Sequence, residues 1–402
     1  MKSDDTTCSS SSSSSPSVNS LYGSYSDHFP IHFDSIVLND EVTAKVLRNA
    51  QKRMNKSSIL PYYDSLLATS EDIGEIAHHE VVLDRMLGHG SFSSVFAIKK
   101  IRGRKAHKYD AESLVVKVLR PKLSLKPSLM AACAADIVME GMLLSTLSHK
   151  NIISIKATSP MGICSFANGR HDAYFLVMEK LEETLEDRIQ RWQSQKHKTL
   201  FHHKLKDHLM LQEQIQVLTQ LGDAIQHLHS QRILYRDAKP ANIGFDKDGV
   251  LKIFDFDVAK ILPDSTDPNE MFQLTKRTGS PRYMAPEIAK GEPYNLKADV
   301  YSYSLICHEV MTLKKPFGTI ASAKHDQAVF YDGVRPEVLK SWPRGFVNLL
   351  KRSWSTDVVG RPTMEEAIKI LQTEFTIMLT IKTPSRKVFN IRRPKTAPIF
   401  VA

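Results

Sequence analysis

The stretch Tyr-Arg-Asp-Ala-Lys-Pro-Ala-Asn at residues 235–242 and the triplet Asp255-Phe256-Asp257 decide the fold of this chain. Asp237 can accept a proton from a hydroxyl nucleophile, and Lys239 can neutralise a transferring phosphoryl group. Oxygen ligands of the kind that Mg²⁺ takes beside phosphates come from Asn242 and Asp255. One short segment therefore supplies a base, a cation and two metal ligands, which together suit phosphoryl transfer.

Two segments upstream carry features that suit a nucleotide. Residues 87–95 read Leu-Gly-His-Gly-Ser-Phe-Ser-Ser-Val, and the two glycines let the backbone approach phosphates and present N–H donors to them. Residues 114–117 read Leu-Val-Val-Lys within an apolar run typical of a buried strand. A glycine loop is a weak signal by itself, so its weight comes from the strand and the catalytic stretch that follow it.

In this order the motifs resemble those of the eukaryotic protein kinase family. The stretch at 235–242 resembles the catalytic loop H-R-D-x-x-x-x-N, and the triplet at 255–257 resembles D-F-G. The other matches are the glycine-rich loop at 87–95, the V-A-I-K strand at 114–117, the Ala-Pro-Glu end of an activation segment at 280–287, the D-V-W-S start of a buried helix at 299–302 and the arginine motif at 360–363. The resemblance covers about residues 78–375.

This resemblance implies an α+β fold with two lobes. A small β-rich N-lobe with its C-helix is expected at residues 78–180, and a larger α-helical C-lobe at residues 181–375. It also implies ATP-dependent transfer of the γ-phosphoryl group to Ser or Thr hydroxyls of protein substrates, with Mg²⁺ as the metal. The motifs after Trp354 lean toward the tyrosine-kinase-like group, whereas Lys239, two residues after Asp237, follows the Ser/Thr pattern.

The resemblance also assigns site residues. Asp237 and Lys239 are the catalytic residues, and Asn242 and Asp255 are the metal ligands. The nucleotide is expected to contact Leu87, Gly88, Gly90, Ser91, Val95, Val115, Lys117, Glu140, Met178, Glu179, Leu181 and Gly244. Within this set Lys117 anchors the phosphates, Glu140 holds Lys117, Met178 is the gatekeeper, and Glu179 to Leu181 form the hinge.

Six further residues are expected to regulate or stabilise the domain. Arg236 can receive a phosphate from the activation segment, where Thr275 and Thr278 are candidate targets of an upstream kinase. Ser280 is expected to bridge Asp237 and Lys239. The resemblance also implies a buried ion pair between Arg361 and Glu287.

The chain departs from the family pattern at several positions. Tyr235 replaces a histidine and is expected to pack under Phe256 while bonding the backbone, and Ser93 replaces a glycine. Asp257 replaces the last glycine of D-F-G, where we expect a backbone with positive φ that strains an aspartate. Val115 and Gly244 stand where the family usually has alanine and leucine. Either the purine sits lower, toward Gly244, or Val115 packs upward into the N-lobe and leaves the purine in place.

Two other functions are compatible with the same motifs. A pseudokinase scaffold, with weak or no transfer because of Asp257, would keep the fold and lose the reaction. A small-molecule kinase would share the fold, but the Ala285-Pro286-Glu287 motif and the long activation segment favour a protein substrate.

Composition adds class-level expectations. The net charge is +10, and basic residues gather at 99–108, at 191–206 and after residue 376. These runs are typical of solvated loops or of surfaces that dock acidic partners; they lack interleaved aromatics, so nucleic acid is not expected. The four cysteines are scattered, which disfavours zinc and favours reduced thiols in the cytoplasm or nucleus. No apolar run approaches membrane-spanning length, and the first residues lack the pattern of a signal peptide.

The flanks and elements complete the expected organisation. Residues 1–38 form a Ser-rich disordered tail, residues 39–77 a linker with one short helix that either docks on the N-lobe or stays free, and residues 376–402 a basic tail. Within the domain, strands are expected at 152–155 and 174–178 around an inserted loop at 159–172. A helix follows Pro127, another carries Ile215 to Leu228, and a buried one spans 300–311.

Overall fold

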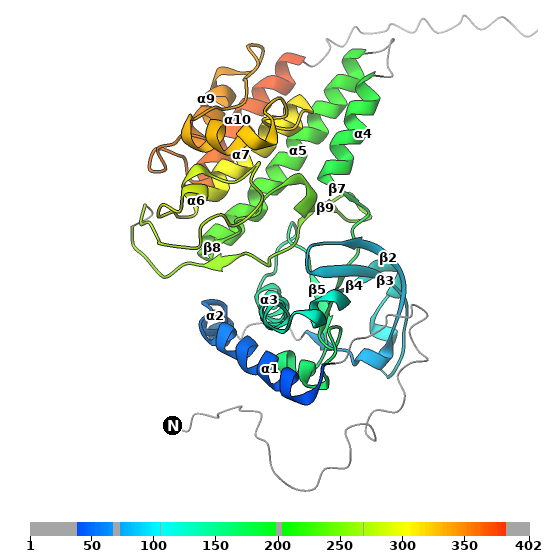
Figure 1. Cartoon of the computed structure of the whole chain (residues 1–402). Coiled ribbons are helices and arrows are strands. Elements are labelled where there is room, and N and C mark those ends of the chain that lie inside the picture. The colour runs from blue at the N-terminus through cyan, green and yellow to red at the C-terminus, as the bar shows by residue number, and fades with distance from the viewer. Residues whose placement is uncertain (1–37, 67–72, 105, 198–202, 268, 383–402) are drawn as a thin grey trace, which may run out of the picture.

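A computed structural model describes residues 38–66, 73–104, 106–197, 203–267 and 269–382. The chain forms two lobes, with the sheet and α3 in the N-lobe and most of the helices in the C-lobe (Figure 1). The expected α+β architecture of a small β-rich lobe and a larger helical lobe is therefore confirmed. The Ser-rich segment and the end of the basic tail lie outside the described residues.

The N-lobe is built on a sheet of six strands in the order β1-β5-β6-β4-β3-β2. Their bounds are β1 Gly74–Glu75, β2 Val81–His89, β3 Ser93–Ile101, β4 Leu114–Leu119, β5 Ile155–Thr158 and β6 Phe175–Glu179. Every residue of β4 is buried, because Val115 and Leu119 join the main core while Leu114, Val116 and Val118 join a second core on the outer face. A strand buried on both faces explains the continuous apolar run in the sequence.

The strand expected at 152–155 is wrong in position. Ile155 begins β5, which continues to Thr158, whereas Ile152 forms only an isolated bridge with Ile253 of the C-lobe. The apolar residues are buried as expected, but they cross from one lobe to the other before the strand begins. The inserted loop carries a 3-10 helix, η7 (Gly162–Asn168).

Helix α3 (Pro127–Ser145) is the expected C-helix. Pro127 occupies its first turn, where a missing N–H costs nothing, and alanine, methionine and leucine favour the helix that follows. By length and composition it is the one described helix that could cross a membrane, and 67% of the tested window is buried inside the protein. The expectation that no segment approaches this length is corrected for α3, although Asp136 and Glu140 interrupt its apolar residues.

The segment before the domain contains more structure than the single helix expected. Helix α1 (Asp40–Asn55) is capped by Asn39, whose side chain accepts a hydrogen bond from Val42 N at 2.9 Å. Helix α2 (Ile59–Leu66) follows, and β1 then pairs in parallel with β5. Of the two roles considered for the first helix, the structure has the docked one: α1 lies along α3 (Figure 1).

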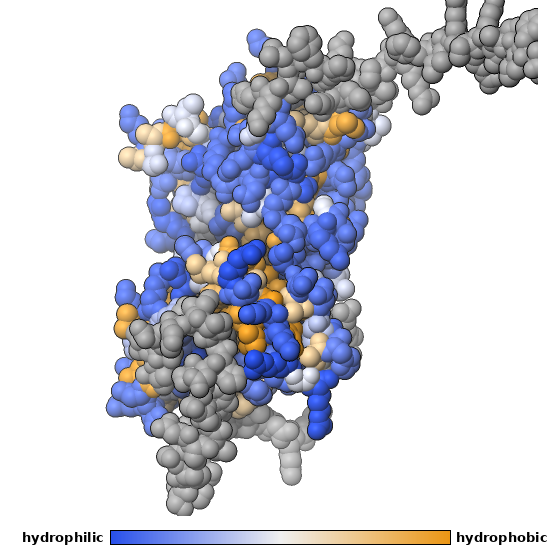
Figure 2. Space-filling model, turned by 90° about the vertical axis from the view of Figure 1, so that its right-hand side faces the viewer, coloured by the Kyte–Doolittle hydropathy of each residue, from blue (hydrophilic) through white to orange (hydrophobic). Residues whose placement is uncertain are grey.

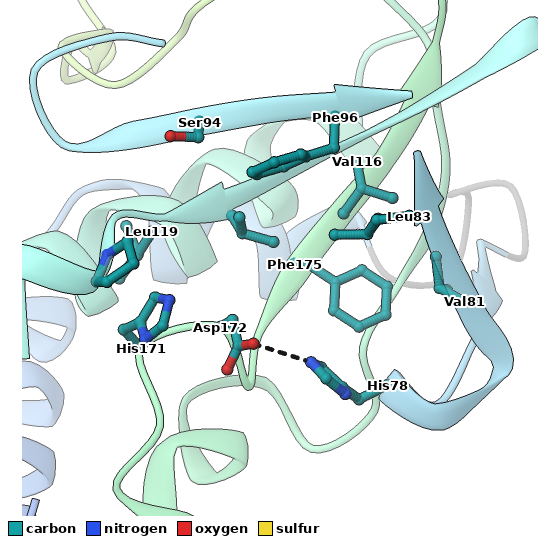
Figure 3. A pocket seen from close by; sticks show the side chains of 12 residues that line it. His78, Val81, Leu83, Ser94, Phe96, Val116, Leu119, His171, Asp172 and Phe175 are labelled. Atoms are coloured by element: carbon teal, nitrogen blue, oxygen red, sulfur yellow. Dashed lines mark hydrogen bonds and ion pairs between the residues drawn. The ribbon is translucent and has the colours of Figure 1, made fainter. Parts of the chain in front are cut away.

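The outer face of the sheet holds a small apolar cavity (Figure 3). Phe96, Val116 and Phe175 line it, and an ion pair between His78 and Asp172 at 3.2 Å closes one rim. Arg170 also binds Asp172, at 2.8 Å. Burial works against the charged carboxylate, yet the hydrogen bonds from His78 and Arg170 hold the pKa of Asp172 well below its usual range. These contacts fasten the inserted loop to the start of the domain.

The C-lobe is a helical body with short strands at the edge that faces the N-lobe (Figure 1). Its helices are α4 (Leu185–His197), α5 (His203–Ser230), α6 (Pro286–Lys290), α7 (Lys297–Thr312), α8 (Ser322–Asp326), α9 (Arg344–Ser353) and α10 (Met364–Lys382). The strands β7 (Glu183–Thr184), β9 (Ile243–Phe245) and β10 (Leu251–Ile253) form one small sheet, and β8 (Ile233–Leu234) pairs with β11 (Lys260–Ile261). Helix α7 is buried over most of its length and packs against α5 and α9, as its apolar sequence indicates.

Candidate functional site

Lys117 and Glu140 form a buried pair between the sheet and the C-helix. Lys117 lies on β4 and Glu140 on α3, and the lysine Nζ contacts the two carboxylate oxygens at 2.8 and 2.6 Å. The exposed fractions are 6% for Lys117 and 2% for Glu140, so neither charge is balanced by solvent. The pair fixes α3 against the sheet, as the motifs predict, because losing one partner would strand a buried charge.

Two more carboxylates share the same lysine. Lys117 Nζ lies 3.2 Å from Asp255 and 3.0 Å from Asp257. Burial works against the ammonium ion, yet the charges of Asp257, Glu140 and Asp255 raise the pKa of Lys117 well above its usual value. Burial raises the pKa of Glu140 well above its usual value despite the nearby lysine. Sequence reasoning did not predict the contact between Asp257 and Lys117.

The strain expected at Asp257 is absent. Positive φ occurs two residues earlier, at Asp255, where φ is 66°. Aspartate is among the residues that adopt this conformation most readily, so the motif accommodates it there. The distinctive feature of Asp257 is therefore the charge it adds beside Lys117, and the expectation of a strained pivot is wrong.

The catalytic loop brings a carboxylate, an ammonium and a hydroxyl together. Asp237 Oδ2 accepts hydrogen bonds from Lys239 Nζ at 2.7 Å and from Asn242 Nδ2 at 2.9 Å. Lys239 Nζ also donates to Ser280 Oγ at 2.9 Å, and Ser280 N donates to Asp237 Oδ1 at 2.8 Å. Ser280 thus bridges the two residues as expected, with its hydroxyl toward Lys239 and its backbone toward Asp237.

Asp299, a buried residue on α7, holds the catalytic loop in place through hydrogen bonds. Asp299 is fully buried and accepts hydrogen bonds from the backbone N–H groups of Tyr235 and Arg236, both at 2.8 Å. His229 lies 3.0 Å from the same carboxylate. Arg236 has a φ of 69°, so the two bonds stabilise an unfavourable backbone turn directly before Asp237. The sequence indicated a motif at Asp299 but not this role.

Tyr235 behaves as the sequence predicts. Its ring lies 5.1 Å from that of Phe256, and its hydroxyl donates to the carbonyl of Phe254. The side chain is completely buried, and burial raises the pKa of the phenol well above its usual value. Tyr235 therefore joins the catalytic loop to the Asp255-Phe256-Asp257 triplet as a neutral hydrogen-bond donor.

The floor of the expected adenine site is formed by a different residue from the one that the sequence pattern suggests. Val115 and Met178 are buried and face each other across β4 and β6. A Cβ built on Gly244 would lie only 2.5 Å from Leu181 Cδ1, so the hinge leucine already fills the space that leucine usually takes at position 244. Leu181 thus occupies the space below the expected purine, which favours the alternative in which Val115 packs into the N-lobe core.

The remaining nucleotide-binding predictions lie on the sheet and the hinge. Gly88 pairs with Val95, and Gly90 N donates to Ser93 O at 2.9 Å, which closes the glycine loop. Leu87 and Ser91 are exposed. Glu179 N donates to Ser154 O at 3.2 Å at the start of the hinge. Apolar surface gathers between the two lobes on the side that carries β2 and β3 (Figure 2).

The residues present fit a divalent cation. Oxygen atoms of Glu140, Asp255 and Asp257 all lie within 4.8 Å of one another, and they share a single ammonium ion. Asn242 lies on the adjoining loop, where its Nδ2 donates to Asp237 Oδ2. This excess of negative charge and hard oxygen donors matches what Mg²⁺ prefers in proteins.

Two contacts further from the reacting groups keep the activation segment in place. Arg361 binds Glu287 through both Nη atoms, at 2.6 and 2.8 Å, and both side chains are buried, as predicted. Gly279 has a φ of 95°, and a Cβ there would lie 2.2 Å from the carbonyl oxygen of Arg236. Only glycine permits this approach between the segment and the catalytic loop.

Comparison with known proteins gives matches over the same part of the chain. It is 25% identical over 316 residues to serine/threonine-protein kinase STY17 of Arabidopsis thaliana, covering 78% of this chain and 48% of that protein. It is 27% identical over 303 residues to human mitogen-activated protein kinase kinase kinase 7, covering 74% of this chain and 42% of that protein. The chain thus spans less than half the length of these curated relatives.

A family model for the protein kinase domain matches residues 81–374, which include both lobes and every motif described above. The chain therefore belongs to the protein kinase domain family.

Proposed function

We propose that this chain is an ATP-dependent protein kinase that phosphorylates Ser or Thr hydroxyls of protein substrates. The observation that carries the proposal is the arrangement of Asp237, Lys239 and Ser280. It places a proton acceptor 2.7 Å from a cation that can neutralise the transferring group.

Each residue has a defined part in the proposed reaction. Asp237 orients the substrate hydroxyl and takes its proton as the oxygen bonds to the γ-phosphorus of ATP. The bond between that phosphorus and the β–γ bridging oxygen breaks, and the electron pair leaves with ADP. Lys239 stabilises the charge on the transferring group, while Lys117, held by Glu140, orients the α- and β-phosphates.

We propose Mg²⁺ as the metal, held by Asp255 and Asn242. When bound, it neutralises charge on the phosphate oxygens.

The proposal also includes an upstream kinase that acts on Thr275 or Thr278. It places the chain in the cytoplasm or nucleus, where thiols such as the buried Cys133 and Cys307 stay reduced.

A degenerate peptide library tests this function. The purified chain, supplied with ATP and Mg²⁺, is expected to phosphorylate peptides that offer Ser or Thr. The Asp237→Asn protein is the matched control for contaminating kinases. Equal phosphorylation by both proteins, or none by either across the library, would overturn the proposal.

A further inference from the structure

A cavity of about 650 Å³ opens between the N-terminal helices, α3 and the activation segment. Asp136 lines it from α3, Asp257 lines it from the triplet at residues 255–257, and Thr275 lines it from the activation segment. It is separate from the small cavity on the outer face of the sheet. Its size is that of a typical ligand site, so a phosphorylated side chain has room to enter.

The cavity has an excess of positive charge. Five cations line it, namely Lys52, Arg53, Lys56, Arg236 and Lys260, against three carboxylates, namely Asp136, Glu140 and Asp257. The carboxylates are already in use, because Arg53 binds Asp136 at 2.9 Å and Lys117 binds the other two.

Within the described part of the chain, the other four cations have no carboxylate partner. Among the described residues, Lys52, Lys56 and Lys260 form no ion pair, and Arg236 donates to Val258 O and Tyr294 OH. Burial and the charge of Arg236 lower the pKa of Lys260, which shows how near these two cations are to each other. Like charges held together without counterions form a site for an anion.

A neutral group in the same wall also lacks a partner. Ser58, between α1 and α2, has a hydroxyl oxygen that is buried without a hydrogen-bond partner in the described structure. A hydroxyl can donate to a phosphate oxygen, and leaving a buried hydroxyl without a partner is unfavourable. The wall built by the N-terminal helices thus offers the charge of Lys52 and Lys56, and the covered Ser58 hydroxyl would have to turn toward the cavity to add a donor.

Thr275 is placed to supply the anion. Arg236 Nη1 lies 3.2 Å from Tyr294 OH, which donates to the Thr275 carbonyl at 2.8 Å. Thr275 is exposed and lines the cavity, whereas Thr278 does not line it and donates its hydroxyl to Thr275 O at 3.1 Å. The geometry therefore favours Thr275 over Thr278 as the residue whose phosphate enters the cavity.

We propose that helix α1 completes a phosphothreonine-binding site, in which Lys52 and Lys56 act with Arg236 and Lys260 on phosphorylated Thr275. Because α1 lies outside residues 81–374, a segment beyond the family domain reads the state of the activation segment. Since α1 also packs on α3, the phosphate would hold the C-helix in place through the N-terminal extension. The regulatory consequence rests on the proposed kinase function; the binding site does not.

The test compares proteins with phosphothreonine or threonine placed at position 275 of the full chain. Lys52→Gln/Lys56→Gln removes two charges from the cavity wall. Lys45→Gln/Arg48→Gln is the matched control, because it removes two exposed charges from the same helix that do not line the cavity. Melting temperature is measured in the Asp237→Asn background, so the result is independent of catalysis.

Phosphate at Thr275 is expected to raise the melting temperature by about 3 °C or more in the parent and the control, and to lose most of that effect in Lys52→Gln/Lys56→Gln. In the active background it should raise kcat/KM at least about fivefold, again only when Lys52 and Lys56 are present. A role of these lysines in stabilising the end of α1 alone would lower all melting temperatures without changing the difference made by phosphate.

Three outcomes would overturn the proposal. The first is a phosphate-dependent shift in melting temperature that persists in Lys52→Gln/Lys56→Gln, which would show that α1 takes no part. The second is a shift produced by phosphothreonine at position 278 but not by phosphothreonine at position 275. The third is that inorganic phosphate stabilises the unmodified protein through Lys52 and Lys56 while phosphorylated Thr275 has no effect. That result would show that the cavity binds a free anion. A shift without any peptide phosphorylation would leave the site standing and overturn only the proposed function.

Discussion

The Asp257 carboxylate lies 3.0 Å from the Lys117 ammonium, at a motif position where glycine would leave no side chain. Lys117 is therefore shared among three carboxylates before any phosphate reaches it. Asp257 acts on the site through its charge, since its backbone is not in a left-handed conformation.

Replacing Asp257 with asparagine or glycine is expected to lower the KM for ATP several-fold at saturating Mg²⁺. The substitution removes a negative charge that repels the triphosphate and frees Lys117 to bind it. Steady-state kinetics of the two variants against the parent measure this. A KM about tenfold higher, or a steeper requirement for Mg²⁺, would instead identify Asp257 as a metal ligand.

Asp237→Asn and Lys117→Met are each expected to lower kcat by about 10²-fold or more, because each removes a group used in the transition state. Asp237→Asn should leave stability nearly unchanged, whereas Lys117→Met should also lower it, because it strands the buried Glu140 carboxylate. Peptide phosphorylation and circular dichroism are the measurements. Asp248→Asn, an exposed turn residue, is the control. Activity of Asp237→Asn within a few-fold of the parent would contradict the mechanism.

Gly244→Leu is expected to destabilise the protein by about 1–3 kcal/mol and to weaken ATP binding, because its Cβ meets Leu181 Cδ1 at 2.5 Å. Adding Leu181→Ala should recover part of both losses, so the two substitutions should be non-additive. Urea unfolding and calorimetric titration with ATP report the two effects. Additive losses would show that Leu181 does not fill the floor.

Glu309→Gln is expected to remove a pH dependence of stability. Burial raises the pKa of Glu309 to about 7, and its carboxyl accepts a hydrogen bond from Tyr283 OH at 2.6 Å. The folded state keeps the proton that the unfolded chain loses near pH 4.5, so stability falls as pH rises from about 4.5 to about 7. The loss is roughly 3 kcal/mol.

Urea unfolding of the parent and Glu309→Gln at several pH values within this window checks the prediction. The amide retains an acceptor for Tyr283, so only the titration is removed. A parent slope that survives in the variant would place its origin in another group.

The catalytic geometry could be predicted because each motif fixes a local element and its contacts at once. Lys117 and Glu140 lie on a strand and a helix that their sequences indicate directly, and Tyr235 meets Phe256 as its size and polarity require. Other features depend on which distant segment fills a space. Leu181 lies over Gly244, and nothing local to either residue indicates that the hinge leucine takes the place of the missing side chain.

Backbone details were also beyond the sequence. An aspartate occurs at both ends of the triplet, and the pattern alone could not show that Asp255, rather than Asp257, takes the positive φ. The run at 152–155 is apolar enough for a strand, but its first residues are buried between the lobes and not in the sheet. Helix α2 is short and β1 has only two residues, so neither leaves a periodic signal.

Tyr62 of α2 donates a hydrogen bond to Gln231 of the C-lobe at 2.6 Å. Besides the hinge and the contacts of Ile152 and Lys117 with the C-lobe, the lobes are thus also tied through a segment that precedes the domain. Opening of the cleft must break or stretch this tie, so it bears on how fast ADP escapes after each turnover, a step that limits many enzymes. Faster ADP release by Tyr62→Phe in stopped-flow experiments would show that the N-terminal segment sets the pace of turnover from outside the catalytic machinery.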